Sequence, residues 1–87
     1  MKRKDDFIMQ NVGGENLLVP LGAQMRDMNG LVILNDTGIC VWELLAAERT
    51  LDELATAVAE QFEVDEVIAR GDVQAFLQEI ARLGMVE

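Results

Sequence analysis

The spacing of hydrophobic residues changes near the middle of the chain. Residues 31–34 are the uninterrupted apolar run Leu-Val-Ile-Leu, whose β-branched and aliphatic side chains favour a strand. Asn-Asp-Thr follows at 35–37, and side chains of this kind cap helices by accepting bonds from the first unpaired amides. Beyond them the apolar positions recur at helical spacing, at Ile39, Val41, Trp42, Leu44 and Leu45. The pattern predicts strands and a loop over residues 1–34 and three helices over residues 35–87.

Two strands are expected before this junction. Residues 7–12 and 17–19 are rich in apolar side chains, and Gly13-Gly14 between them can supply the positive φ angles of a tight hairpin turn. Pro20 has no N–H, so it either ends the second strand or leaves it at a sheet edge. The hairpin is the first local element that the sequence predicts.

Residues 21–30 allow two interpretations. Asn29-Gly30 is a strong turn signal, which would fold Met25–Met28 back onto residues 31–34 as a short hairpin. The same stretch is also compatible with a loop. We expect mostly loop, with a turn at Asn29-Gly30.

The third strand, Leu31, Val32, Ile33 and Leu34, is apolar at every position. A strand with one face in water would alternate apolar and polar residues. One face is therefore expected to meet the core, and the other to be covered by a helix, a second subunit or a ligand.

Three helices are expected after the third strand. The first runs from about Thr37 to Ala47, and Thr50-Leu-Asp-Glu53 is a capping box that starts the second. Asp65 can cap the third helix, and Gly84 stands where a left-handed glycine ends one. The third helix carries one apolar face, made of Ala69, Val73, Phe76, Leu77, Ile80 and Leu83. Strands followed by three helices predict an α+β, winged-helix-like domain with a three-stranded antiparallel sheet.

Length and composition are typical of one small cytoplasmic domain. The 87 residues contain no apolar run long enough for a transmembrane helix, and the start of the chain lacks the apolar segment of a signal peptide. A single cysteine, Cys40, lies in the apolar stripe of the first helix and is expected to be a small buried hydrophobe. Trp42 in the same stripe is expected to be buried.

The net charge of −9 comes entirely from the helical part. Residues 31–87 hold twelve acidic side chains and three arginines, whereas residues 1–30 are balanced. Such a surface repels phosphate backbones and suits a basic partner. The alternative is that the acids only keep a small protein soluble.

The chain lacks the residue patterns of enzymes. It has no histidine or tyrosine, one cysteine, and no spacing typical of metal ligands. Gly13-Gly14 lacks the pattern of a phosphate-binding loop. The sequence therefore predicts neither catalysis nor a cofactor.

Two residues of the third helix depart from the local rules. Gly71 lies inside the helix, at a cost of about 1 kcal/mol relative to alanine, and Asp72 follows it. One interpretation is a helix that frays or bends near its start. The other is that Gly71 lets another backbone approach and that Asp72 anchors an amide or a cation of a partner.

The order of these features resembles the PqqD-like proteins, the peptide chaperones of pyrroloquinoline quinone biosynthesis, also called RiPP precursor recognition elements. The resemblance covers residues 31–87. It rests on Leu34-Asn-Asp-Thr-Gly38, Val41-Trp-Glu-Leu-Leu45, Thr50-Leu-Asp-Glu-Leu54, Asp72-Val73, Phe76-Leu77 and Leu83-Gly84. The long, methionine-containing stretch 21–30 departs from the usual member.

This resemblance implies a peptide-binding protein without catalytic activity. In the family, the leader of a precursor peptide adds as a strand beside the third strand, against the third helix, and is presented to a modifying enzyme, often a radical SAM protein. Carried onto this chain, the contacts would come from strand 31–34 and from the Val67–Leu77 part of the helix. The candidate peptide-binding residues are Leu31, Val32, Ile33, Leu34, Val67, Arg70, Gly71, Asp72, Gln74 and Leu77.

Two other classes of function stay open. A winged-helix DNA-binding regulator would need a basic third helix, but this one carries Arg70 and Arg82 against four acids. An adaptor or dimerisation module with no peptide ligand is the other alternative. An exposed strand edge also promotes self-association, so a homodimer, through that edge or by exchange of the first two strands, is a further expectation.

Overall fold

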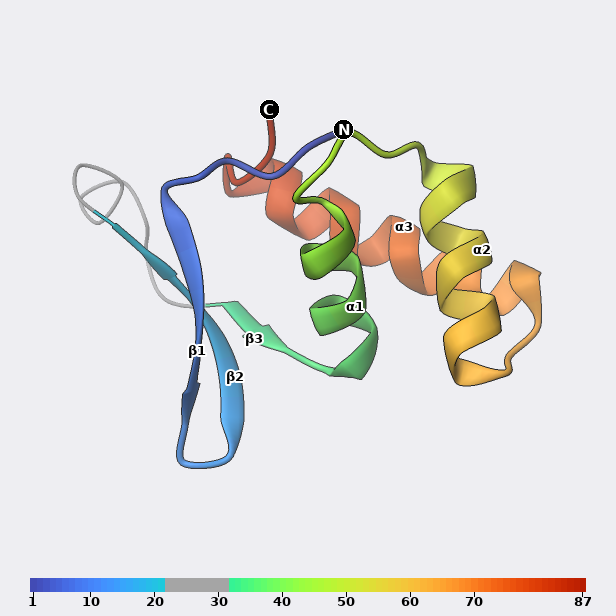
Figure 1. Cartoon of the computed structure of the whole chain (residues 1–87), viewed down its shortest axis with the longest axis horizontal. Helices are drawn as coiled ribbons and strands as arrows, with labels where there is room; N and C mark the ends of the chain where they lie inside the picture. The colour runs from blue at the N-terminus through green and yellow to red at the C-terminus, as the bar shows by residue number, and fades with distance from the viewer. Residues whose placement is uncertain (22–31) are drawn as a thin grey trace.

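The computed structural model describes residues 1–21 and 32–87, which form a three-stranded antiparallel sheet followed by three helices (Figure 1). This confirms the predicted α+β class and the order of its elements. The strands are β1 (Phe7–Val12), β2 (Glu15–Pro20) and β3 (Val32–Leu34), and the helices are α1 (Asp36–Leu44), α2 (Leu51–Phe62) and α3 (Glu66–Arg82).

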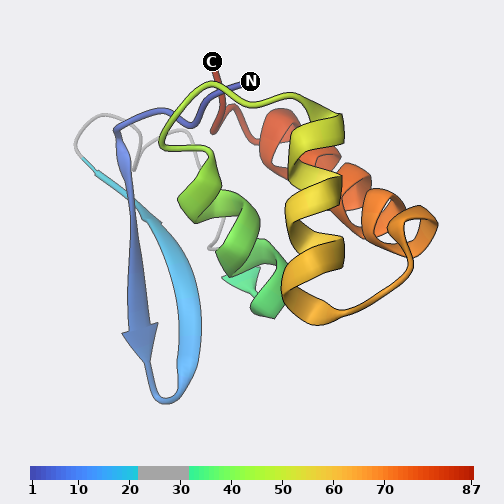
Figure 2. The same cartoon turned by 45° about the vertical axis from the view of Figure 1, so that its right-hand side comes forward.

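The sheet has the order β1-β2-β3, so β3 lies at one edge. Gly13 and Gly14 adopt φ angles of +62° and +88°, as predicted for the tight turn between β1 and β2. Pairing begins directly beside this turn, with Val12 opposite Glu15. Strand β2 is therefore longer than the predicted 17–19, because polar residues next to the turn also pair. The hairpin projects away from the helices in both views (Figures 1 and 2).

Strand β3 begins at Val32 in the described part of the chain, and Leu31 of the predicted strand lies outside it. The predicted turn at Asn29-Gly30 and the alternative hairpin through Met25–Met28 also lie outside the described residues. Pro20 is the last residue of β2, which is the central strand of the sheet. This confirms the first of the two alternatives for Pro20, that it ends the second strand.

Side-chain caps define the starts of all three described helices. Asn35 accepts a bond from the Gly38 amide, Thr50 and Glu53 form the predicted capping box, and Asp65 accepts from the Val67 amide. The predicted end of α1 at Ala47 is wrong. The Ala46 and Ala47 amides bond to carbonyls only three residues back, so the chain tightens into turns after Leu44.

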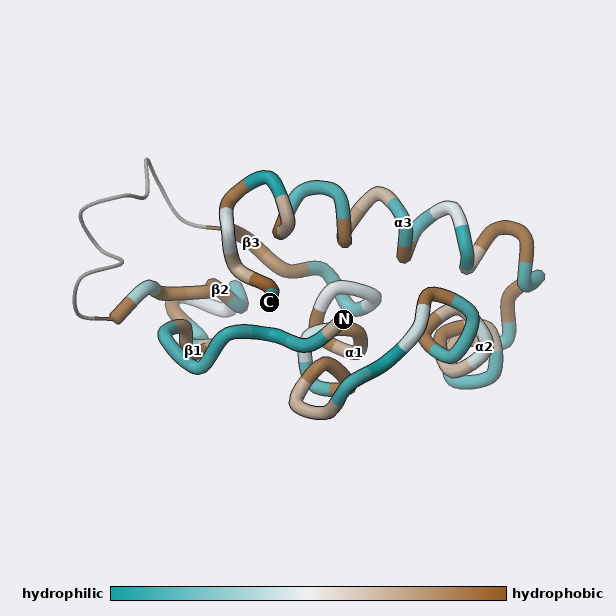
Figure 3. Tube along the Cα trace, turned by 90° about the horizontal axis from the view of Figure 1, so that it is seen from above, coloured by the Kyte–Doolittle hydropathy of each residue, from teal (hydrophilic) through white to brown (hydrophobic). Residues whose placement is uncertain are grey.

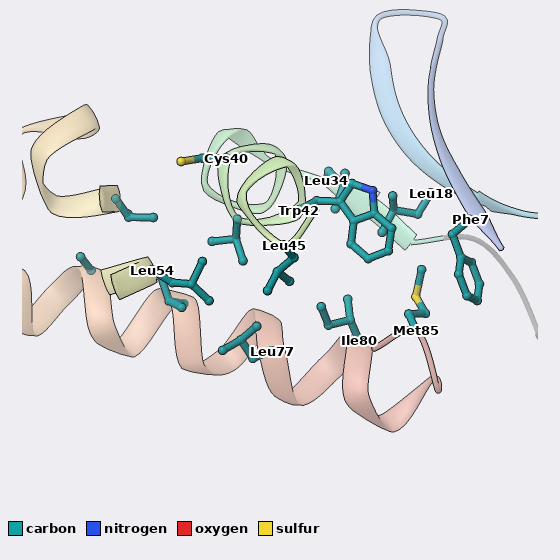
Figure 4. Close-up of a cluster of buried hydrophobic side chains, with 14 residues drawn as sticks. Phe7, Leu18, Leu34, Cys40, Trp42, Leu45, Leu54, Leu77, Ile80 and Met85 are labelled. Atoms are coloured by element: carbon teal, nitrogen blue, oxygen red, sulfur yellow. The ribbon is translucent and has the colours of Figure 1, made fainter. Parts of the chain in front are cut away.

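The core lies where α1 packs between the sheet and the other two helices (Figure 4). Trp42 is 1% exposed, which confirms its predicted burial, and its ring meets Phe7 edge-to-face at a centroid distance of 6.4 Å. The guanidinium of Arg3 lies 5.4 Å from the Trp42 ring and donates a bond of 2.9 Å to the Trp42 carbonyl oxygen. Trp42 thus joins the N-terminal segment, the sheet and α1.

The two ends of the chain lie side by side over this core. Val86 forms an isolated antiparallel bridge with Arg3, and the Lys4 amide donates to the Met85 carbonyl oxygen at 3.0 Å. Gly84 makes the turn out of α3 with a φ of +74°, as predicted. Among residues 1–21 and 32–87, no helix has the length and apolarity to cross a membrane.

Candidate functional site

A groove with a volume of about 360 Å³ lies between β3, the start of α1 and one side of α3. Figure 3 shows β3 running between β2 and the C-terminal half of α3. The groove is lined by Ile33, Asn35, Thr37, Asp72, Ala75 and Phe76. Its wall therefore combines apolar side chains with one carboxylate, one amide and one hydroxyl.

The backbone of Ile33 faces away from β2, at the edge of the sheet that no strand of the described residues occupies. The Leu21 amide donates to the Asp6 carbonyl oxygen at 2.7 Å, so the backbone groups of Leu21 point toward β1. Backbone groups alternate in direction along a strand, so those of Leu18 and Asn16 point toward β3, where they face Val32 and Leu34. The N–H and C=O of Ile33, which lies between those two, must point away from β2.

The side chains of β3 divide between the core and the groove. Leu34 is 5% exposed and belongs to the core, and Val32 is partly buried against it. Ile33 is 62% exposed and lines the groove. The prediction that one face of this strand meets the core is confirmed. The other face has no cover from the described residues at Ile33.

The helical wall of the groove depends on Gly38. A Cβ atom at this buried glycine would lie 3.2 Å from Cδ2 of Leu34 and 3.2 Å from Cε1 of Phe76. Any side chain at this position would require the Leu34 side chain or the Phe76 ring to shift by a few tenths of an ångström. The glycine thus fixes the position of Phe76 between the core and the groove.

Two of the predicted contact residues meet in the groove, Ile33 from β3 and Asp72 from α3. The interpretation that Asp72 is available to a partner fits this position. Sequence reasoning did not assign Asn35, Thr37, Ala75 and Phe76 to the site. Asn35 was recognised only as a capping residue, and Phe76 only as part of the apolar face.

Three other predicted residues of α3 do not line the groove. Arg70 forms an ion pair with Asp52 of α2, so it lies on the α2 side of the helix. Two residues along an α-helix correspond to a rotation of about 200°, which places Arg70 and Gln74 almost opposite Asp72. Val67 is 80% exposed and is also absent from the groove.

The last two predicted residues of α3 also lie elsewhere. Leu77 is 7% exposed and packs in the core, because it follows Val73 by one helical turn on the buried face. Gly71 is exposed, and a Cβ atom there would meet no described atom within 4 Å. Nothing in the described chain requires a glycine at this position.

A second hollow, of about 310 Å³, lies beside β1, at the opposite edge of the sheet from β3. Its lining residues are Arg3, Phe7, Ile8, Met9, Trp42 and Glu43. The Arg3 side chain is already held by the ring and the carbonyl oxygen of Trp42. The first groove differs because its strand edge and its carboxylate have no such internal partner among the described residues.

Residues 1–21 and 32–87 contain no group of three side chains placed to hold a metal ion. Cys40 is buried, as predicted, and its thiol donates to Oε1 of Gln61 at 3.2 Å. Burial, and secondarily the Glu43 carboxylate, raise the pKa of this thiol, which keeps it in the unreactive protonated form.

Comparison with known proteins gives one family and one related structure. The family model of coenzyme PQQ synthesis protein D (PqqD) matches residues 15–86. The structure of TbiB1 in complex with the TbiA(beta) leader peptide aligns with a TM-score of 0.73 and 23% sequence identity, over 100% of this chain and 95% of that one. At this identity the alignment establishes a shared fold. Comparison with curated proteins gives no match.

Proposed function

The chain belongs to the PqqD family, and from this premise we propose that it binds the leader segment of a ribosomally made precursor peptide. The peptide adds as a fourth strand along the open edge of β3, and its alternate side chains pack against Asp72, Ala75 and Phe76 of α3. One observation carries the proposal: the outward-facing N–H and C=O of Ile33 lie beside a groove of about 360 Å³. This arrangement is that of β-strand addition, in which main-chain bonds provide affinity and pockets provide specificity.

The related structure supports a leader peptide as the ligand. TbiB1, which shares the fold, was solved with a leader peptide. The uncovered side chain of Ile33 is also explained, because an added strand and its side chains would bury it. The all-apolar third strand thus obtains cover on both faces, from the core and from the peptide.

The bound leader then brings the rest of the precursor to a modifying enzyme. We propose that this enzyme is of the radical SAM type, that both proteins are cytoplasmic, and that the present protein contributes binding and no catalytic step. The acidic helices would speed the approach of a basic leader or enzyme, so the association rate should fall as salt concentration rises.

Without a peptide, the open edge of β3 is also available to a second copy of the chain. A homodimer formed there would compete with peptide. Sedimentation at increasing protein concentration should reveal dimers that dissociate when peptide is added. A monomer at all concentrations would exclude the homodimer and leave peptide binding unaffected.

NMR titration with a leader peptide tests the proposal. The peptide is the leader of the precursor encoded beside this protein. Amide shifts should concentrate on residues 32–38 and on the groove side of α3. Shifts confined to β1 and α2 would contradict the proposed site.

Three edge variants separate main-chain from side-chain binding. Ile33→Pro removes the outward N–H and should weaken binding about 2- to 10-fold more than Ile33→Ala, which keeps it. Asn11→Pro is the matched control, because the same alternation points the Asn11 N–H away from β2 at the opposite edge of the sheet. It should leave affinity unchanged. Equal affinity of Ile33→Pro and Ile33→Ala would exclude strand addition at this residue.

A further inference from the structure

The groove contains a carboxylate with no cationic partner in the described part of the chain. Asp72 lines it, and the ion pairs among residues 1–21 and 32–87 involve the acidic side chains of Glu48, Asp52 and Glu79 instead. The other lining residues are uncharged. Asp72 is therefore the acid that a ligand in the groove would meet.

The spacing along α3 matches the spacing along an extended peptide. Asp72 and Phe76 are one turn apart, about 6 Å along the helix axis. Side chains on one face of a strand repeat every two residues, about 6.6 Å. A strand lying alongside α3 therefore places one side chain at Asp72 and the next side chain on the same face at Phe76.

The two positions differ in chemistry. The second is apolar, since Ala75 and Phe76 line it. The missing side chain of Gly38 leaves room for the Phe76 ring at this position, because a Cβ atom there would lie 3.2 Å from Cε1 of Phe76. The first position offers a negative charge, which attracts lysine or arginine and repels aspartate or glutamate.

We infer that this groove selects peptides that carry a basic residue two positions from an apolar one. Asp72 binds the basic side chain, and Ala75 and Phe76 receive the apolar one. This inference rests on the proposed strand addition and specifies which leaders the site accepts. It does not depend on the direction of the added strand.

Selection from a random peptide library tests the inference without a known leader. Twelve-residue peptides displayed on phage are selected against immobilised wild-type protein, Asp72→Lys and Glu60→Lys. Wild type should enrich Lys or Arg two positions from an apolar residue, and Asp72→Lys should enrich Asp or Glu at that same place. Glu60→Lys, with the same change in net charge on exposed α2 outside the groove, should enrich the wild-type pattern.

Affinity measurements on the selected peptides complete the test. Fluorescence anisotropy should show that Asp72→Asn binds the best basic peptide about 2- to 5-fold more weakly, as expected for a partly exposed ion pair. It should bind the Lys→Gln form of that peptide as wild type does. Circular dichroism checks that each variant is folded.

Two contrary outcomes have different meanings. In the first outcome, the selected peptides bind Ile33→Pro more weakly than wild type, but they show no preference for a basic residue, or the same preference is selected by Asp72→Lys. This outcome would overturn the inference and leave the proposed strand addition unaffected. Enriched peptides that are insensitive to Ile33→Pro, or no enrichment at all, would contradict both the inference and the proposed function.

Discussion

The two flanks of α3 are both exposed, yet they face different neighbours. The flank with Arg70 faces α2, where Arg70 pairs with Asp52 and Glu66 accepts a bond of 3.1 Å from the Thr56 hydroxyl. The flank with Asp72 and Phe76 faces β3 across a groove. The first flank is used within the fold, and we propose that the second binds the peptide. Charged side chains near the start of one helix can therefore have unrelated roles.

The two flanks of α3 can face different neighbours only if the core holds the helix in one orientation. Trp42→Ala removes the largest fully buried side chain, and we expect a loss of about 3–5 kcal/mol in the free energy of unfolding. In a domain of 87 residues this can abolish folding. Chemical denaturation measures the loss. A midpoint close to that of wild type would show that Trp42 does not anchor the core.

Gly38 links the core to the groove flank. Gly38→Ala places a methyl group against Leu34 and Phe76, and we expect a loss of about 1–3 kcal/mol together with displacement of the Phe76 ring. Peptide affinity should fall even at temperatures where the variant is fully folded. Thermal melts and anisotropy measured on one preparation separate the two effects. Unchanged affinity in the folded variant would show that Phe76 does not shape the site.

Adjacent residues of α3 provide the sharpest contrast between the flanks. Ala75→Glu puts a charged side chain into the groove and should abolish most peptide binding. Gln74→Glu adds a similar charge outside it and should leave affinity nearly unchanged. Both positions are exposed, so each variant should stay within about 0.5 kcal/mol of wild-type stability. Similar losses of affinity in both would contradict the assignment of the flanks.

Much of the fold was predictable because its signals are local. The capping box at Thr50, the cap at Asp65 and the turn glycines each depend on neighbours within a few residues, and each is where the sequence predicts it. The sequence also predicted that α3 and the third strand lie on either side of one groove, and residues of both line it. The end of α1 was missed because the tightening after Leu44 leaves no mark on the apolar stripe.

The site was harder to predict because it depends on how elements are placed around α3. Periodicity separates buried from exposed positions, as for Leu77 and Asp72, but does not say which exposed flank faces the sheet. Val67, Arg70 and Gln74 were assigned to the groove for this reason. Phe76 was assigned only to the apolar face of the helix. In the structure it lies close to Gly38 and also lines the groove.

The smallest expected effect concerns the α2 side and depends on pH. The Thr50 backbone amide, followed by its hydroxyl, lowers the pKa of Glu53 below the usual 4.5. Folding therefore favours the charged carboxylate of Glu53. Its stabilising effect is fully present above the usual pKa of 4.5, and it is lost as the pH falls through the lower pKa of the folded state. Glu53→Gln should melt below wild type at pH 7, and the difference should shrink below about pH 4. A constant difference across this range would contradict the pKa shift, and peptide affinity at pH 7 should not change.

The exchange rate of the Ile33 amide tests strand addition most directly. In the free protein this N–H points away from β2 and should exchange quickly, whereas the amides of Val32 and Leu34, which bond to β2, should exchange more slowly. A saturating leader peptide should protect Ile33 selectively. An Ile33 amide that exchanges equally fast in the free and the peptide-bound protein would contradict strand addition at β3.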